Sequence, residues 1–261
     1  DVYKCTDHST GKYVAIKRTN FDLAETHDIS QVIREINILE HVDHPNIVKL
    51  YDVKHGRFGR MYFMYEYVET DMSKIIESKQ FITNEHVRFF MYQIACGIQY
   101  LHSANIIHRD IKPANILMNA DCSVKICDFG MSCTTPVLDS LDSSREFVPK
   151  SKLITGNKRK HTSVDMKTCV TSEKPDGCMT QYVTTRWYRA PEVILLQKYT
   201  SAIDVWALGC VFTELLGMMR DNCPNPDLRK AIFPGKTCFP LSAPKSSDYM
   251  SRYDQLNVIF D

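Results

Sequence analysis

Two segments constrain this chain more than any others: IHRDIKPAN at residues 107–115 and Asp-Phe-Gly at residues 128–130. Two short apolar runs, at residues 116–118 and 124–127, lie between these segments. Such a pair of runs is typical of two strands joined by a turn. Asn115 and Asp128 offer amide and carboxylate oxygens, the hard ligands that Mg²⁺ prefers. Because this spacing of polar residues is specific, we interpret the two segments as a reaction site and not as ordinary loops.

These segments resemble the catalytic loop, H-R-D-x-K-x-x-N, and the D-F-G turn of protein kinases. The resemblance implies phosphoryl transfer with ATP and Mg²⁺ as cofactors. In that family Asp110 would accept or orient the hydroxyl proton of the substrate, and Lys112 would lie against the γ-phosphate. Asn115 and Asp128 would bind the metal ion. The implied fold is α+β with two lobes: a small, mainly β N-lobe that carries helix C and a larger, mainly helical C-lobe.

The composition is that of an ordinary globular protein. The 261 residues are 44% hydrophobic and 24% charged, with a formal net charge of +1. This balance gives no case for nucleic acid or an anionic membrane as the main partner, and no apolar run approaches the ~20 residues of a membrane helix. The ten cysteines are scattered without C-x-x-C pairs, as in proteins with free thiols. We therefore expect a protein of the cytoplasm and nucleus, with neither nucleic acid nor membrane as partner.

The start of the chain contains two strand patterns, at residues 2–5 and 13–17. The second, V-A-I-K, resembles the kinase strand whose lysine, here Lys17, contacts the α- and β-phosphates of ATP. Apolar residues at spacings of three and four predict a helix at Asp28–His41, on which Glu35 resembles the glutamate that pairs with this lysine. Val2 stands where the family has the valine after its glycine-rich loop, and those glycines are absent. We expect a kinase domain that is incomplete at both ends.

Residues 61–68, MYFMYEYV, form an apolar strand that runs into a linker and resembles the kinase hinge. The resemblance makes Tyr65 a bulky gatekeeper at the back of the nucleotide pocket, and the thiol of Cys127 would face the same pocket. The N-lobe would comprise residues 1–68 and the C-lobe residues 69–261. ATP would contact Val2, Ala15, Lys17 and Tyr65, the backbone of Glu66 and Val68 at the adenine edge, Asp71 at the ribose and Leu117 beneath the adenine.

Two further helices are predicted around the catalytic loop. Residues 83–103 carry an apolar stripe with helical spacing, and Thr83 is a plausible helix start. Residues 201–210 resemble the buried helix that anchors the large lobe, with Ser201 as its N-cap. In the family Asp204 would accept hydrogen bonds from the backbone of the catalytic loop.

Residues 180–192, TQYVTTRWYRAPE, resemble the activation lip of mitogen-activated protein (MAP) kinases. In that family a dual-specificity kinase phosphorylates the threonine and the tyrosine, here Thr180 and Tyr182, and the phosphates order the lip by pairing with arginines. Thr185 would belong to the pocket that favours proline after the acceptor. The candidate phosphate-binding residues are Arg34 and Arg109 for Thr180, and Arg186 and Arg189 for Tyr182.

Residues 134–178 are rich in Ser, Thr, Lys and Asp and poor in periodic apolar spacing, so we expect a disordered insertion in the activation segment. Glu192, the glutamate of A-P-E, has in the family an arginine partner that this sequence does not offer. A buried carboxylate without a partner is costly. The residues from 1 to 261 by themselves are therefore expected to be poorly stable.

We expect a MAP kinase-like serine/threonine kinase that phosphorylates Ser/Thr-Pro sites in protein substrates during intracellular signalling. Its other partners would be an upstream MAP kinase kinase and phosphatases. A cyclin-dependent-like kinase remains an alternative, because that group shares T-R-W-Y-R-[AS]-P-E. A catalytically silent nucleotide-binding scaffold is a second alternative. The residue between Thr180 and Tyr182 is Gln181, where the best-known MAP kinases have Glu, Pro or Gly, so the upstream activator stays open.

Overall fold

The computed structural model describes residues 1–20, 26–56, 60–134, 186–238 and 254–261. Residues 180–185 of the expected lip, which include Thr180, Tyr182 and Thr185, lie outside these ranges, as do residues 135–178 of the expected insertion. Thr134, the first residue of the expected insertion, instead belongs to strand β9 (Cys133–Thr134), which pairs with β6 (Ile106–Ile107).

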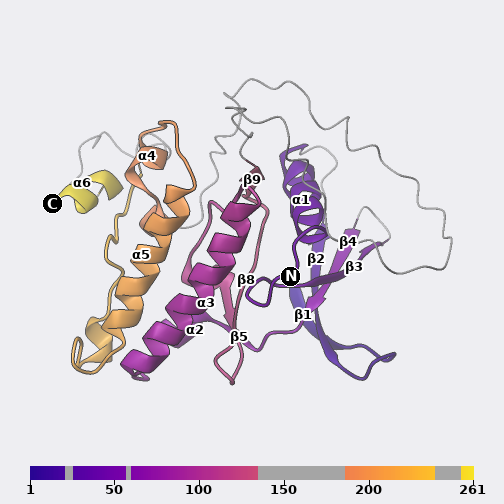
Figure 1. Ribbon diagram of the computed structural model, residues 1–261, viewed down its shortest axis with the longest axis horizontal. Coiled ribbons are helices and arrows are strands. Elements are labelled where there is room, and N and C mark those ends of the chain that lie inside the picture. Colours follow the sequence, from indigo (N-terminus) through magenta and orange to yellow (C-terminus); the bar gives the residue numbers. More distant parts are fainter. Residues whose placement is uncertain (21–25, 57–59, 135–185, 239–253) are drawn as a thin grey trace. The chain divides into compact units, whose positions relative to one another are not determined.

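Strands dominate the N-terminal part, where four of them form an antiparallel sheet in the order β1-β2-β4-β3 (Figure 1). Helix α1 (Thr26–Leu39) follows β2, and it begins and ends two residues earlier than the periodicity predicts. Its residues Ile38 and Leu39 share one buried cluster with Phe63 and Tyr65 of the sheet, which fixes helix against strands. The strands are β1 Val2–Thr6, β2 Tyr13–Asn20, β3 Leu50–His55 and β4 Arg60–Glu66.

Helices dominate the C-terminal part. Helix α3 (Asn84–Ser103) packs on α5 (Ala202–Gly217) and on β8 (Val124–Ile126), as its apolar stripe predicts. Ile94 and Leu101 of α3 are fully buried in the main hydrophobic cluster, together with Val211 of α5. The remaining elements are β5 Thr70–Asp71, α2 Met72–Glu77, β7 Ile116–Met118, α4 Pro191–Ile194 and α6 Gln255–Phe260, with 3₁₀ turns at Pro113–Asn115, Arg186–Tyr188 and Pro226–Leu228.

Thr83 begins α3 through a reciprocal cap. Its hydroxyl accepts from the backbone of His86, and the ring of His86 accepts from the backbone of Thr83. We expect Thr83→Ala to lower the free energy of unfolding by about 1 kcal/mol, because the amide of His86 loses its acceptor and the ring of His86 loses the hydroxyl that it contacts. Urea unfolding of the parent protein measures this loss. Thr213→Ala is the control, since that hydroxyl only returns to the helix carbonyl of Cys210, and an equal loss in both variants would contradict the capping role.

Ser201 is the N-cap residue of α5, as predicted, but its side chain does not cap the helix. Its backbone already has helical angles, with φ −57° and ψ −13°, and its side chain makes no capping hydrogen bond. A capping side chain reaches the free amides of the first turn from an extended backbone. The helical backbone of Ser201 does not provide that geometry.

The environment of Glu192 also differs from the expectation. The side chain lies in the first turn of α4 and is half-buried, not fully buried. Water therefore solvates part of this carboxylate, and the helix N-terminus favours its charge. The desolvation penalty behind the expected low stability is correspondingly smaller.

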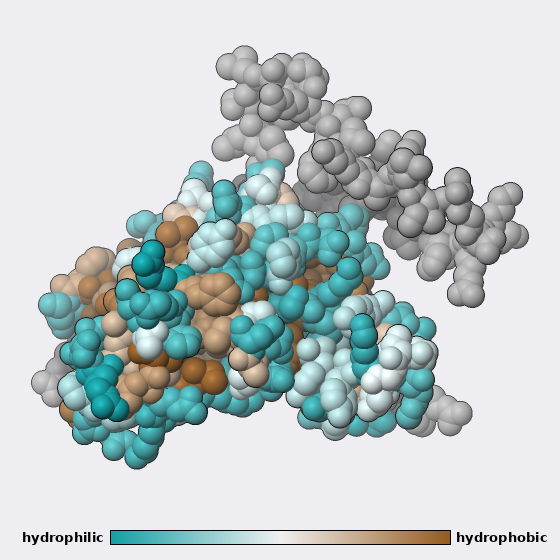
Figure 2. Space-filling model, turned by 60° about the horizontal axis from the view of Figure 1, so that its bottom comes forward, coloured by the Kyte–Doolittle hydropathy of each residue, from teal (hydrophilic) through white to brown (hydrophobic). Residues whose placement is uncertain are grey.

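Hydrophilic residues cover most of the face in Figure 2, with apolar residues gathered in patches. The large apolar side chains that α5 exposes include Val205 and Phe212. Within the described ranges, no helix combines the length and apolarity that crossing a bilayer requires.

The expected α+β class is confirmed, with strands first and helices after them. The boundary between residues 68 and 69 stays a prediction.

Candidate active site

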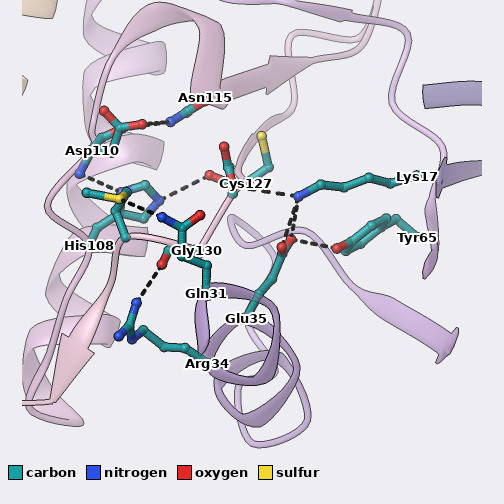
Figure 3. Close-up of polar contacts among 12 residues, drawn as sticks. Lys17, Gln31, Arg34, Glu35, Tyr65, His108, Asp110, Asn115, Cys127 and Gly130 are labelled. Carbon is teal, nitrogen blue, oxygen red and sulfur yellow. Dashed lines mark hydrogen bonds and ion pairs between the residues drawn. The ribbon is translucent and has the colours of Figure 1, made fainter. Parts of the chain in front are cut away.

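Three elements bring charged side chains together at one end of the candidate site. Lys17 extends from β2, and its Nζ lies 2.9 Å from Oε2 and 3.2 Å from Oε1 of Glu35 on α1 (Figure 3). The same Nζ lies 3.7 Å from Oδ1 of Asp128. Burial alone would lower the pKa of Lys17, but the carboxylates of Glu35 and Asp128 outweigh it and raise that pKa. Lys17 is therefore a fixed positive charge beside Asp128.

Asp110 and its neighbours form the other end of the site. The Nζ of Lys112 lies 2.7 Å from Oδ2 of Asp110, and Nδ2 of Asn115 donates to the same oxygen at 2.9 Å. A second bond from Nδ2 of Asn115 reaches the backbone carbonyl of Asp110 at 2.8 Å. The 3₁₀ turn Pro113–Asn115 returns the chain so that Asn115 faces Asp110. The predicted residues of the catalytic loop thus converge on one carboxylate.

His108 joins the two ends. Its Nε2 lies 3.1 Å from the carbonyl oxygen of Cys127, and its Nδ1 accepts from the backbone amide of Asp110 at 3.2 Å (Figure 3). The ring meets Phe129 edge-on, with 5.0 Å between centroids, and both residues are fully buried. His108 therefore fixes the catalytic loop against the Asp-Phe-Gly turn. The sequence motif contains this histidine, but its spacing alone does not reveal the role.

Asp204 of α5 holds the backbone of the catalytic loop, as predicted. Its Oδ2 accepts from the amide of His108 and its Oδ1 from the amide of Arg109, both at 2.9 Å. The ring of His102 contacts Oδ2 at 2.8 Å, and Asp204 is 1% exposed. Arg109 has a φ of 66°, a left-handed backbone conformation that residues other than glycine rarely adopt. The hydrogen bonds to Asp204 compensate for the strain of this turn.

Residues of the expected nucleotide pocket occupy neighbouring strands. Ala15 pairs with Tyr65 between β2 and β4, and Asp71 pairs with Leu117 between β5 and β7. The carboxylate of Asp71 also caps α2 by accepting from the amide of Lys74 at 3.2 Å. Other predicted positions are less enclosed: Val2 is 68% exposed and Val68 is half-buried. The side chain of Glu66 accepts at 2.7 Å from the amide of Lys49, directly before β3, and pairs with Lys125 at 3.0 Å.

Cys127 is half-buried directly before Asp128, and this environment shifts the pKa of its thiol. Burial, and next the charge of Asp128, raise the pKa of its thiol well above the ordinary value. The thiolate is the nucleophilic form of cysteine. At neutral pH this thiol therefore keeps its proton, which is its less nucleophilic form.

Three of the four predicted phosphate-binding arginines, Arg34, Arg109 and Arg189, have other side-chain contacts. Arg34 donates from Nη1 to the carbonyl of Gly130 at 2.8 Å, and Arg109 donates to the hydroxyl of Tyr199 at 2.8 Å. Arg189 contacts the buried thiol of Cys238 at 3.4 Å, and Nε of Arg186 is buried without a hydrogen bond. Burial lowers the pKa of Arg189. The sequence gives no signal for the contacts with Tyr199 or Cys238.

A cavity of about 680 Å³ adjoins the catalytic loop. Lys112 lines this cavity and also contacts Asp110 at 2.7 Å, so the cavity lies beside the predicted catalytic carboxylate. Tyr188 forms part of the wall and donates from its hydroxyl to Oε1 of Glu214 at 2.6 Å. Prolines and aromatic rings contribute as well, so the wall is partly apolar: the lining includes Pro113, Trp187, Pro226 and Pro234.

The family model described as "Protein kinase domain" matches residues 1–221. The chain is 38% identical to "Mitogen-activated protein kinase 1" of Oryza sativa subsp. japonica over 240 residues, 90% of this chain and 48% of the relative. It is 38% identical to "Mitogen-activated protein kinase homolog NTF3" of Nicotiana tabacum over 242 residues, 91% of this chain and 52% of the relative. This chain spans about half the length of the curated relatives it matches.

Proposed function

Because the chain belongs to the protein kinase family, whose two-lobed α+β fold it shares, we propose that its parent protein is a serine/threonine kinase of the MAP kinase type. One observation carries the proposal. The Lys17–Glu35 pair and Asp128 lie at one end of a site whose other end is Asp110 with its two partners. Phosphoryl transfer needs positive charge near the transferring phosphate and a group that orients the attacking hydroxyl, and Lys17 and Asp110 are suited to these two roles.

Protein kinase domains use ATP, generally with Mg²⁺, and the described residues fit both. Asn115 directs its amide nitrogen to Asp110, which leaves the amide oxygen as a metal ligand, and the side chain of Asp128 is 48% exposed beside Lys17. Two protein oxygens suffice, because Mg²⁺ completes its coordination with water and phosphate. No group of three or more His, Cys, Asp or Glu side chains in the described part forms a metal cage. When bound, the metal neutralises charge on the phosphates.

The residues of the chain have separate roles in the proposed reaction. Lys17, held by Glu35, binds the α- and β-phosphates. Asp110 accepts or orients the proton of the attacking hydroxyl, while Lys112 offsets negative charge at the transferring group. Asn115 keeps Asp110 in place through its two hydrogen bonds. Most of the rate enhancement would come from this alignment and not from covalent chemistry.

A protein substrate fits the cavity beside the catalytic loop. Its walls combine rings and prolines with charged residues, and Lys112 lines it. An extended peptide lying there would bring a hydroxyl to Asp110. We propose Ser/Thr-Pro sites as the acceptors, on the similarity of the chain to MAP kinases. The cytoplasm and nucleus suit such a protein, because the cysteines of the described part are free.

Activation is proposed to require phosphate at Thr180 and Tyr182, which an upstream MAP kinase kinase would add and phosphatases would remove. Arg34 and Arg109 lie against the backbone after Asp128, so a phosphate that binds them would also fix that turn. Arg186 and Arg189 lie near each other and supply positive charge for the second phosphate.

Thr180→Ala and Tyr182→Phe should each abolish most of the activation. We expect the doubly phosphorylated parent protein to be about 5–150-fold more active than either variant, the range of a typical coupling energy. Phosphate transfer from ATP·Mg²⁺ to a Ser-Pro or Thr-Pro peptide measures the difference. Full activity in Tyr182→Phe would favour a cyclin-dependent-like kinase. Nucleotide binding without transfer in the phosphorylated protein would indicate a scaffold.

A further inference from the structure

Tyr65 makes the shortest described contact of Glu35. Its hydroxyl donates to Oε1 of that carboxylate at 2.5 Å, whereas the nearest approach of Lys17 to the same oxygen is 3.2 Å. Figure 3 shows Lys17 and Tyr65 pointing at the carboxylate from the sheet. Glu35 is 4% exposed and Tyr65 is 7% exposed, so water does not substitute for these partners. A buried carboxylate depends on every donor that it keeps.

The register of the sheet explains why both donors reach one acceptor. Ala15 pairs with Tyr65 and Lys17 with Phe63 between β2 and β4. Paired residues of an antiparallel sheet share a face, and so do residues two apart on one strand. Lys17 and Tyr65 are therefore diagonal neighbours on the face that meets α1.

The ring of Tyr65 is held in this orientation. It stacks on Phe63, which is completely buried, at 6.2 Å between centroids and 14° between planes. Burial, and next the charge of Glu35, raise the pKa of the Tyr65 hydroxyl well above the ordinary value for tyrosine. The hydroxyl thus keeps its proton and remains a donor.

We propose that Tyr65 is a positioning residue for phosphate binding, because its hydroxyl fixes the Glu35 carboxylate that aims Lys17. This inference rests on the proposed contact of Lys17 with the phosphates of ATP. Oε1 is held by Tyr65 and Oε2 is the closer partner of Lys17, so the hydrogen bond sets the rotation of the carboxylate. Without it Glu35 can turn, and the ammonium group of Lys17 follows the carboxylate or moves towards Asp128.

The test compares two ligands on the full-length parent protein. ATP·Mg²⁺ carries the phosphates that Lys17 would contact, and adenosine does not. We expect Tyr65→Phe to weaken ATP·Mg²⁺ binding by about ten-fold, the effect of losing one hydrogen bond to a charged group, and to leave adenosine binding unchanged. The phenyl ring retains the shape of the pocket. Tyr62→Phe is the matched control, because Tyr62 lies on the same strand, three positions away and on the opposite face.

A double-mutant cycle distinguishes this role from a general loss of packing. In a Glu35→Gln background the carboxylate is absent, and we expect the ATP-selective effect of Tyr65→Phe to fall below about two-fold. Equal weakening of both ligands, no weakening of either, or the same ATP-selective effect in the Glu35→Gln background would overturn the proposal. Equal affinity of the unaltered protein for ATP·Mg²⁺ and adenosine would also overturn it. If the protein were not a kinase, phosphate transfer would be absent. The ratio of the affinities for ATP·Mg²⁺ and adenosine would still test the role of Tyr65.

Discussion

Asp110→Asn should lower kcat for peptide phosphorylation by roughly 10²–10⁴-fold, the usual contribution of a positioned general base. Asparagine keeps the size of the side chain and an oxygen that accepts from Lys112 and Asn115. The arrangement of the loop should therefore survive, and the loss would report the missing charge. The measurement is transfer from ATP·Mg²⁺ to a Thr-Pro peptide by the doubly phosphorylated parent protein.

Asp121→Asn is the matched control for this experiment. Asp121 lies in the turn between β7 and β8, where its carboxylate accepts from the amide of Ser123 at 2.8 Å, a bond that asparagine can keep. We expect unchanged kcat in the control and unchanged affinity for ATP·Mg²⁺ in both variants. If Asp110→Asn retained more than about a tenth of the activity, Asp110 would not have the proposed role.

Asp204→Ala should have the largest effect on stability, a loss of about 3–6 kcal/mol in the free energy of unfolding. The estimate counts two backbone amides, those of His108 and Arg109, at about 1.5–3 kcal/mol for each bond to a charged acceptor. Both amides would remain buried or half-buried without their acceptor. Since whole domains have about 5–15 kcal/mol of stability, a loss of this size would unfold a substantial fraction of the protein.

Urea unfolding of the parent protein measures the loss, and hydrogen exchange at the amides of residues 108 and 109 localises it. Asp204→Asn should lose less, because one acceptor oxygen remains. Asp227→Ala is the surface control: its ion pair with Lys79 is exposed on both sides, and such pairs contribute about 0–1 kcal/mol. Similar losses in Asp204→Ala and Asp227→Ala would show that Asp204 does not anchor the loop.

The sequence by itself determined the family and the main elements, and it pointed to the residues of the candidate site. Within one helix or strand, the spacing of residues dictates which side chains share a face, so the apolar stripe of α3 and its start after Thr83 were predictable. The motifs likewise pointed to Asp110, Lys112 and Asn115 in the loop before β7 and to Asp128 in the turn after β8, because each motif keeps its residues at a fixed spacing. The pairing of Lys17 with Glu35 was predictable from the resemblance and is confirmed by the 2.9 Å contact.

Only the tertiary structure decided contacts between elements. The hydrogen bond from Tyr65 to Glu35 depends on how α1 is rotated over the sheet, which neither segment specifies alone. The raised pKa of Cys127 and the contact of Arg189 with Cys238 depend in the same way on packing. The difference has one physical reason. Local geometry repeats with the period of a helix or strand, whereas burial and partners across elements are set by how side chains fill the space between them.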